Sequence, residues 1–342
     1  MSIEVIRPGL LSSVQDEGRT GYRRHGIHVG GVMDTFAARA ANMLVGNSRH
    51  EAVLEMTMTG PELRFQKSQL VSLCGADLTA TVNHLPVPLW RPVLFRAGSV
   101  LKFGPCPHGL RGYMAIAGGI DVPVVMGSRS TDLKTGLGGV EGRSLHTADL
   151  LSTGQSSAEA QCWLQHMERH AEKNGRQTMA PAWFLSERER PDYYGRRIIR
   201  VMPGKDSSQF SEASLERFYT EGYVVSPQSD RMGYRLQGAS LELDQPLDRL
   251  SEAVTHGTVQ VPPDGQPIIL MADHQTIGGY PVIAQVAQVD MPILAQARPG
   301  TRLAFEQITH EQGQQLYMEQ ESNMQLMDKL IRRRMAEMEG TQ

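Results

Sequence analysis

The residues best suited to chemistry lie near the end of the chain, where residues 268–287 read IILMADHQTIGGYPVIAQVA. An apolar run ends at Met271 and apolar alternation resumes at Val282, which predicts two strands flanking a short loop. That loop holds a carboxylate, an imidazole, an amide and a hydroxyl: Asp273, His274, Gln275 and Thr276. A hairpin turn has no structural use for such a set, so we predict a binding or catalytic loop. The alternative is that Gly278 and Gly279 only turn the chain while the polar side chains face water.

Two further clusters combine arginine with hydroxyl or carboxylate groups. Arg129 and Ser130 follow the strand-and-turn sequence AIAGGIDVP, and Asp230 and Arg231 open the strand-rich second half of the chain. A guanidinium fork next to hydroxyl groups suits recognition of a small polar anion. A solvated surface pair of arginine and aspartate is the alternative for each cluster.

A glycine-rich segment, residues 25–31 (HGIHVGG), precedes a predicted helix that Asp34 can cap. The exposed amides of a helix N-terminus suit an anion, and Arg19 lies just upstream. Equally, Asp34 alone can satisfy those amides. His25 and His28 have no third ligand at a telling distance, so we predict ordinary hydrogen-bonded histidines and no metal site.

The rest of the chain organises around short strands. At 342 residues two domains are expected, and the pattern predicts a first domain at 1–152, a connector at 153–195, a second domain at 196–308 and a helical tail at 309–342. Short strands separated by Gly, Pro, Asp or Asn favour a sandwich or barrel. The motif G-x-x-L-x-F recurs at Gly60, Gly98 and Gly300, a weak hint of duplicated barrels.

Two helices are expected outside the barrels. The connector holds one from Ala158 to Lys173, and the tail carries an apolar stripe that should pack on the body of the protein or on a partner protein. The residues of that stripe are Leu316, Met324, Met327, Ile331, Met335 and Met338.

Composition limits the classes of partner. The net charge of −3 gives no general attraction to nucleic acid or anionic membranes, so neither is expected as a partner. Three cysteines without CxxC spacing argue for a reducing, cytoplasmic location. The N-terminus MSIEVIRPGLL resembles neither a signal peptide nor a membrane anchor.

Four segments, residues 16–47, 115–132, 229–236 and 259–281, resemble the allophanate hydrolase subunit 2 family, also called the biotin-dependent carboxyltransferase family. The similarity runs from about residue 3 to residue 306. The resemblance implies a mainly β fold of two cyclophilin-like β-barrel domains with a few short helices and a C-terminal helix.

The family resemblance also implies a choice of chemistry. Stand-alone members act with sister B and A subunits as an ATP-hydrolysing 5-oxoprolinase, which opens the cyclic amide 5-oxoproline to glutamate. Members fused into urea carboxylase transfer a carboxyl group from carboxybiotin, and other relatives antagonise a kinase inhibitor without catalysis. This chain has no Ala-Met-Lys-Met biotin-attachment sequence, so the stand-alone reading leads. Which of the subunits holds ATP stays open, and biotin enters only under the carboxyltransferase reading.

Under this reading the catalytic residues are expected to be His274, Asp273, Gln275 and Asp16. The substrate-binding residues are expected to be Arg19, His25, Arg129, Ser130, Asp230, Arg231 and Thr276. His274 is the preferred proton shuttle because the unperturbed pKa of imidazole lies nearest to neutrality. Since no nucleotide-binding motif is visible, we expect the chain to be inactive alone and to work in a hetero-oligomer.

Overall fold

The computed structural model describes residues 3–195, 197–245 and 250–337. It divides into two compact units, and each unit is made of segments that are not consecutive in the chain. One compact unit comprises the chain up to residue 18, residues 34–190 and the chain from residue 324 onward. The other comprises residues 19–33 and 191–323. The linear division expected from the sequence therefore differs in three places. Residues 19–33 belong to the second unit, residues 153–190 of the expected connector belong to the first unit, and the C-terminal helix is divided between the units.

The first unit contains two mainly antiparallel sheets. The seven-stranded sheet has the order β11-β12-β1-β4-β9-β6-β7, and the six-stranded sheet has the order β13-β8-β5-β10-β3-β2. The strands of the first sheet are β1 (Ile3–Arg7), β4 (Glu62–Phe65), β6 (Thr81–Val82), β7 (Leu85–Pro86), β9 (Val100–Lys102), β11 (Ile120–Asp121) and β12 (Leu150–Thr153). Those of the second are β2 (Leu11–Gln15), β3 (Val53–Thr57), β5 (Gln69–Asp77), β8 (Pro92–Phe95), β10 (His108–Ile116) and β13 (Thr178–Met179).

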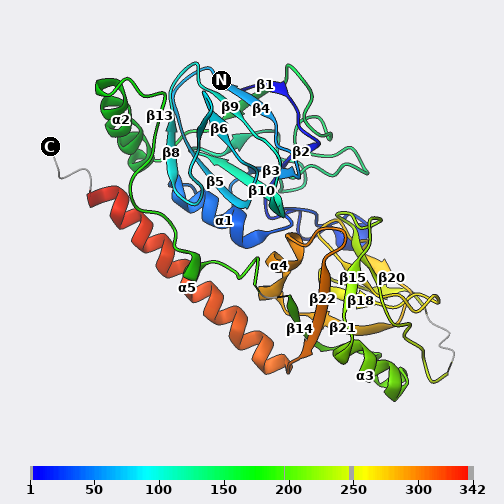
Figure 1. The fold of residues 1–342 in the computed structure, drawn as a ribbon. Helices are drawn as coiled ribbons and strands as arrows, with labels where there is room; N and C mark the ends of the chain where they lie inside the picture. The colour runs from blue at the N-terminus through cyan, green and yellow to red at the C-terminus, as the bar shows by residue number, and fades with distance from the viewer. Residues whose placement is uncertain (1–2, 196, 246–249, 338–342) are drawn as a thin grey trace. The chain divides into compact units, whose positions relative to one another are not determined.

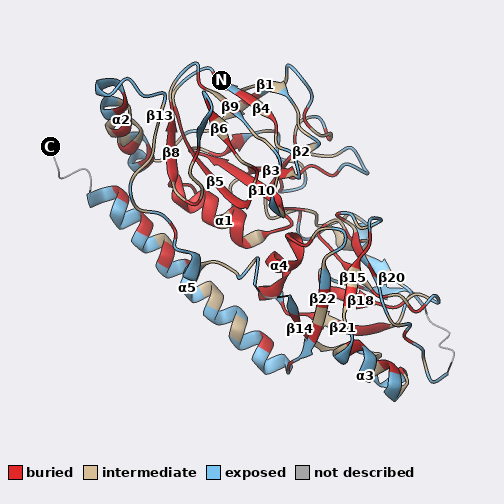
Figure 2. Ribbon diagram, in the orientation of Figure 1, coloured by how far each residue is buried: buried red, intermediate tan, exposed pale blue. Residues whose placement is uncertain are grey.

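Both sheets contribute to one hydrophobic core in this unit. Leu63 and Phe65 of β4 are fully buried at alternate positions, as expected for a strand with one face on the core. The ring of Phe65 stacks on Phe95 of the other sheet, with centroids 4.7 Å apart. Figure 2 shows the resulting concentration of buried residues in β5, β10 and β3.

Helix α1 (Thr35–Leu44) lies against β5 and β10 (Figure 1). Its N-terminus is capped as the sequence predicts, because the Asp34 side chain accepts a hydrogen bond from the amide of Ala37. Asp34 is itself fully buried. Helix α2 occupies the predicted range, Ala158–Lys173, and Ser157 caps it through the amide of Ala160. The short helix η2 (Glu187–Glu189) follows.

The second unit is built on a closed seven-stranded barrel with the order β14-β21-β18-β19-β16-β15-β22. Its strands are β14 (Ile198–Pro203), β15 (Tyr223–Val225), β16 (Gly233–Gln237), β18 (Thr258–Gln260), β19 (Ile268–Leu270), β21 (Val282–Val286) and β22 (Arg302–Gln307). A separate pair joins β17 (Glu252–Ala253) to β20 (Ile277–Gly278). The helices of this unit are η1 (Arg23–His25), η3 (Ser207–Gln209), α3 (Glu212–Thr220), η4 (Gln288–Asp290) and α4 (Met291–Ala295).

The mainly β prediction is confirmed, and the recurrent G-x-x-L-x-F motif marks core strands in both units. Leu303 and Phe305 of β22 are buried in the barrel, as Leu63 and Phe65 are in the first unit. The ring of Phe305 stacks on Phe218 of α3 at 4.5 Å.

The strands that flank the polar loop do not pair with each other. β19 pairs with β16 and β18, whereas β21 pairs with β14 and β18. Strand β18 therefore lies between them, and residues 271–281 cross over it. This pairing joins segments far apart in sequence, which alternation of apolar residues cannot reveal.

The C-terminal helix α5 spans His310–Glu337. Its predicted apolar stripe packs on the protein: Met324, Met327, Ile331 and Met335 are buried, and Leu316 packs against Ile308 in the second unit. Met338 lies outside the described residues. None of the helices within the described residues is long and apolar enough to cross a membrane.

Candidate functional site

The predicted residues separate into two groups, and the first lies around Asp16 just after β2. One carboxylate oxygen, Oδ1, accepts hydrogen bonds from the Ser128 and Ser130 hydroxyls, both at 2.6 Å, and from the Gly18 amide at 2.8 Å. The other, Oδ2, accepts one from the Arg129 amide at 2.5 Å. Four donors thus surround this carboxylate. The structure brings the predicted residues Asp16, Arg129 and Ser130 together, and their polar groups bond to one another.

The main consequence of these contacts is that a loop is held against β2. Thr131 continues the attachment, since its amide and its hydroxyl both donate to the Val14 carbonyl at 2.9 Å. The guanidinium of Arg129 donates from Nε to the Val122 carbonyl at 3.2 Å. A carboxylate with this many internal donors is well suited to anchoring a loop.

The second group lies in the barrel unit and centres on an ion pair between Arg231 and Asp273. Arg231 Nε donates to Asp273 Oδ2 at 2.7 Å and Nη2 donates to Oδ1 at 2.9 Å, a bidentate fork. Both side chains are largely buried, with 8% and 14% of their surface exposed. The Asp273 amide also donates to the Arg231 carbonyl at 2.8 Å. The Arg231 guanidinium, which we expected to bind a substrate anion, is therefore paired with the Asp273 carboxylate of the same chain.

Residues 19–33 join this group although they precede the first helix of the other unit. Arg231 Nη2 donates to the Gly31 carbonyl at 2.6 Å. Gly30 has a φ of +67°, and a Cβ atom there would lie 3.6 Å from Asp273 Oδ1 and 3.9 Å from Arg19 Nη1. Arg19 is fully buried, and its amide donates to the Val29 carbonyl at 2.8 Å. Arg19 and Asp273 thus lie close to Gly30, and Arg231 bonds to the neighbouring Gly31.

His274 is buried on the loop that crosses β18. Its Nδ1 is 2.6 Å from the Gln275 carbonyl oxygen. A carbonyl can only accept, so Nδ1 carries the proton and the neutral ring presents an unprotonated Nε2. Burial is the largest influence on the pKa of His274 and lowers it. The hydrogen bond to the Gln275 carbonyl partly opposes this shift, the charges of Arg23 and His28 add to it, and that of Asp273 opposes it slightly. At neutral pH His274 is therefore a neutral imidazole able to accept a proton at Nε2.

The remaining predicted residues have more local roles. The Asp230 carboxylate accepts from the amides of Met232 at 2.8 Å and Gly233 at 3.2 Å, which is a turn-forming contact. The Thr276 carbonyl accepts from the Val254 amide at 3.3 Å. His25 is exposed, and its Nε2 accepts from Arg24 Nε at 3.1 Å.

At the expected helix N-terminus the buried Asp34 carboxylate already caps α1 by accepting from the Ala37 amide. No group of three His, Cys, Asp or Glu side chains within the described ranges is arranged to hold a metal ion.

Sequence reasoning missed His256, whose charge interacts with His274 and Arg231. The apolar residues between Val254 and Val261 predict a strand over this whole range, but β18 begins only at Thr258. The sequence contains one sign of this turn, because the apolar run is interrupted by Thr255, His256 and Gly257.

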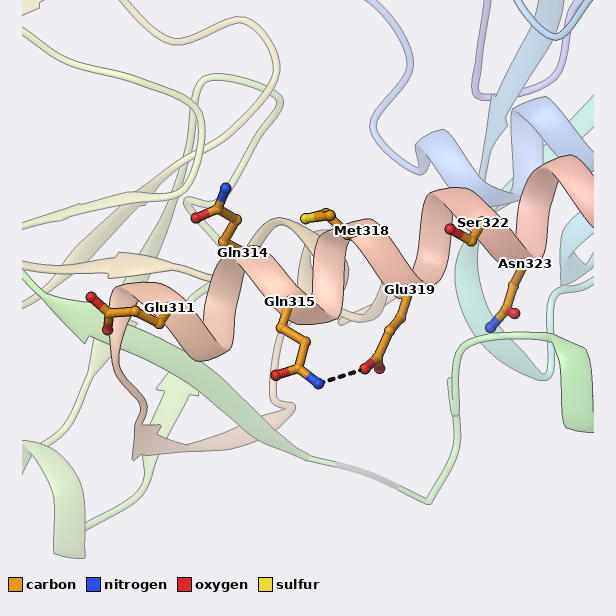
Figure 3. A pocket seen from close by; sticks show the side chains of 7 residues that line it. All are labelled: Glu311, Gln314, Gln315, Met318, Glu319, Ser322 and Asn323. Carbon is orange, nitrogen blue, oxygen red and sulfur yellow. Dashed lines mark hydrogen bonds between the residues drawn. The ribbon is translucent and has the colours of Figure 1, made fainter.

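A separate groove of about 770 Å³ lies along the first half of α5 (Figure 3). It is lined by Glu311, Gln314, Gln315, Met318, Glu319, Ser322 and Asn323. In Figure 3 the Gln315 amide donates to Glu319, at 2.9 Å. No imidazole or guanidinium lines this groove, and none of the predicted site residues does.

The profile of the family described as "Carboxyltransferase domain, subdomain A and B" matches residues 25–307. This chain belongs to that carboxyltransferase family. The matched range includes Arg231, Asp273, His274 and Arg129, whereas Asp16 and Arg19 precede it.

Two relatives of similar length show which members of the carboxyltransferase family resemble this chain. It is 40% identical to the C subunit of 5-oxoprolinase from Escherichia coli, over 93% of this chain and 97% of that protein. It is 35% identical to the C subunit of 5-oxoprolinase from Haemophilus influenzae, over 96% and 98%.

Two solved structures are similar to this chain in fold. The K. lactis urea amidolyase aligns with a TM-score of 0.83 at 28% identity, over 94% of this chain but only 20% of that one. The chain therefore spans about a fifth of that larger enzyme. A crystal structure of TTHA0988 aligns with a TM-score of 0.71 at 29% identity, over 90% of this chain and 100% of that one.

Proposed function

We propose that this chain is the C-type subunit of an ATP-dependent 5-oxoprolinase, which opens 5-oxo-L-proline to L-glutamate together with A-type and B-type subunits. One observation carries the proposal: the chain is 35–40% identical to two proteins named as the C subunit of 5-oxoprolinase, across nearly their whole length. The name of those relatives implies a multi-subunit complex, and so a hetero-oligomer for this chain.

The chemistry assigned to this chain is proton transfer during hydrolysis of a cyclic amide. When bound in the complex, ATP would supply the phosphoryl group that activates the lactam carbonyl oxygen and that leaves as inorganic phosphate. Water then adds to the carbonyl carbon and the C–N bond breaks, which requires one proton to leave water and one to reach the departing nitrogen. His274 suits this task because its Nδ1 proton is fixed on the Gln275 carbonyl and its Nε2 is left to take and return a proton.

In this proposal Arg231 and Asp273 position the loop rather than contact the reacting atoms. Their bidentate pair attaches the segment that precedes His274 to residues 19–33 through the Gly31 carbonyl. An acid–base group that is held in the correct orientation can increase the rate of proton transfer to and from the substrate.

We propose that ATP binds within the complex, and we assign none of its phosphate contacts to residues of this chain. The sequence offered two anion-binding features, the Arg231 fork and the N-terminus of α1. Both are engaged by carboxylates of the chain, Asp273 and Asp34. A nucleotide phosphate would have to displace a buried partner in either place, at a cost of several kcal/mol.

A second function has specific support, which is carboxyl transfer from carboxybiotin to an amide such as urea. The chain aligns with urea amidolyase of Saccharomyces cerevisiae at 28% identity over 96% of its own length, although this covers only 18% of that protein. A carrier domain would have to come from another chain. The lower identity and the small share of that enzyme covered make this the weaker candidate.

The test is reconstitution of the chain with candidate A-type and B-type subunits. We expect a stable complex on size-exclusion chromatography and ATP-dependent release of glutamate from 5-oxoproline, with no turnover by the chain alone. Turnover that depends on biotin and bicarbonate would instead support carboxyl transfer. Complex formation without either activity would favour a binding role, such as antagonism of a kinase inhibitor.

A further inference from the structure

The turn before β18 runs alongside the His274 loop and is bonded to it at both ends. The Val254 amide donates to the Thr276 carbonyl at 3.3 Å, and the Gly257 amide donates to the Leu270 carbonyl at 2.7 Å. His256 lies between the two bonded residues of the turn, and His274 lies between the two bonded residues of the loop. The backbone thus places two imidazoles in facing segments.

The turn that carries His256 is firmly held. The Thr255 amide donates to the Thr258 hydroxyl at 3.1 Å, and that hydroxyl donates to Gln285 Oε1 at 2.9 Å. Gln285 Nε2 in turn donates to the His256 carbonyl at 2.8 Å. Because Gln285 belongs to the barrel strand β21, the turn is fixed to a rigid element.

The His256 ring has one atom whose hydrogen-bonding capacity is unused. Its Nε2 is buried, and it has no hydrogen-bond partner within the part of the chain that the structure describes. Leaving a buried polar atom without a partner costs about 1–3 kcal/mol, so such atoms in native proteins call for an explanation. One explanation is a ligand that supplies the missing partner.

The charges around His256 restrict what that ligand can be. Burial, with smaller contributions from the neighbouring charges of His274 and Arg231, lowers the pKa of His256 to about 4, so the ring is neutral near pH 7. Arg23, His28 and Asp273 face His274 on the adjoining segments. Arg231 is already paired with Asp273. A neutral imidazole next to a satisfied ion pair favours a polar but uncharged group.

We propose that His256 is a second imidazole of the His274 site and that its Nε2 hydrogen-bonds the amide group of the ligand. An amide presents an N–H donor and a C=O acceptor side by side, so it complements Nε2 in either tautomer, whereas a carboxylate can only accept. Under the proposed function, on which this choice of ligand rests, that amide is the lactam of 5-oxoproline. His256 then holds the lactam while His274 moves the proton.

The first test compares His256→Phe with His256→Asn in the reconstituted complex. Loss of one hydrogen bond to the substrate should raise KM for 5-oxoproline about tenfold to a hundredfold in the Phe variant. The Asn variant keeps a polar group and should recover part of that loss. His310→Phe, a change at an exposed histidine of the same unit, is the matched control and should leave KM unchanged. A His256→Phe variant with the original KM would overturn the proposal.

The second test measures the NMR signals of the His256 ring. Its outcome for amide binding by His256 does not depend on whether the complex is a 5-oxoprolinase. In the complex containing the ¹⁵N-histidine-labelled chain, the His256 resonances are assigned by their loss in His256→Asn. Saturating 5-oxoproline, 2-pyrrolidinone or urea should shift the Nε2 resonance. If the complex fails to release glutamate, the proposed function is wrong, yet a shift with 2-pyrrolidinone or urea still supports His256 as an amide ligand. The absence of any shift with all three amides contradicts it.

Discussion

Asp16 and Asp273 both lie shortly after a strand, β2 in one unit and β19 in the other, but the two units use them differently. Asp16 accepts bonds from two hydroxyls and two amides of its own unit. Asp273 is held by one buried guanidinium and precedes His274, whose pKa is lowered. The pKa of His256, which lies near His274 and Arg231, is also lowered. The Asp16 loop is therefore equipped mainly for rigidity, and the Asp273 loop also has groups that can exchange protons.

The largest expected effect in this comparison is on turnover after His274→Gln. Loss of a general acid–base group should lower kcat of the reconstituted complex by roughly two to four orders of magnitude. Glutamine is close in size to histidine and keeps an N–H that can donate to the Gln275 carbonyl, so the melting temperature should change little. Both quantities are measured on one sample. A variant that melts early in proportion to its lost activity would show that buried His274 is structural.

Next in size is the stability contributed by the Arg231–Asp273 pair. Removing one member of a buried ion pair leaves an uncompensated charge and should cost about 3–5 kcal/mol. We expect Arg231→Ala and Asp273→Ala each to show this loss in urea denaturation, and the double variant to lose less than their sum. The exposed pair Arg64–Glu4, at 2.9 Å, is the control and should show a coupling of at most about 1 kcal/mol. Equal couplings for both pairs would contradict the contrast between the sites.

Local features of this fold were easier to predict from the sequence than contacts between residues that are far apart in the chain. Asp34 and the helix from Ala158 to Lys173 were predictable because caps and apolar spacing act over a few residues. The partner of Arg231 was not, since Asp273 is 42 residues away and the two meet only after β16 pairs with β19.

Only those parts of the site that local sequence determines were predictable. The polar loop with His274 was visible as a break between apolar segments. The assignment of residues 19–33 to the barrel unit was not visible, because it depends on contacts such as Arg231 to the Gly31 carbonyl. His256 escaped attention because the apolar residues around it extended a predicted strand over the turn that holds it.

A pH dependence of stability should follow from the two imidazoles. The pKa of His256 is lowered to about 4 in the folded chain, from about 6.5 when unfolded. Between these values the unfolded state binds more protons, so stability is fully present above about pH 6.5 and is lost as pH falls toward 4. The lowered pKa of His274 acts in the same direction.

This loss is measured from urea unfolding at pH 4 to 7. His256 should account for roughly 3 kcal/mol of it, and His256→Asn should remove that share. The same pH slope in His256→Asn as in the unaltered chain would show that His256 is not a source of the acid sensitivity.

The smallest expected effect comes from Asp16→Asn in the other unit. Asparagine can keep one acceptor oxygen, for the hydroxyls of Ser128 and Ser130, but its NH₂ group cannot accept from the Arg129 amide. One buried donor loses its partner, so unfolding should become easier by about 1–3 kcal/mol. Turnover per folded complex should stay within about twofold, because none of these contacts involves a proton that the proposed reaction moves. Denaturation and kcat are compared with those of His274→Gln, where the expected pattern is reversed. Full stability with a large loss of kcat would place Asp16 among the catalytic residues, as its position in the sequence predicted.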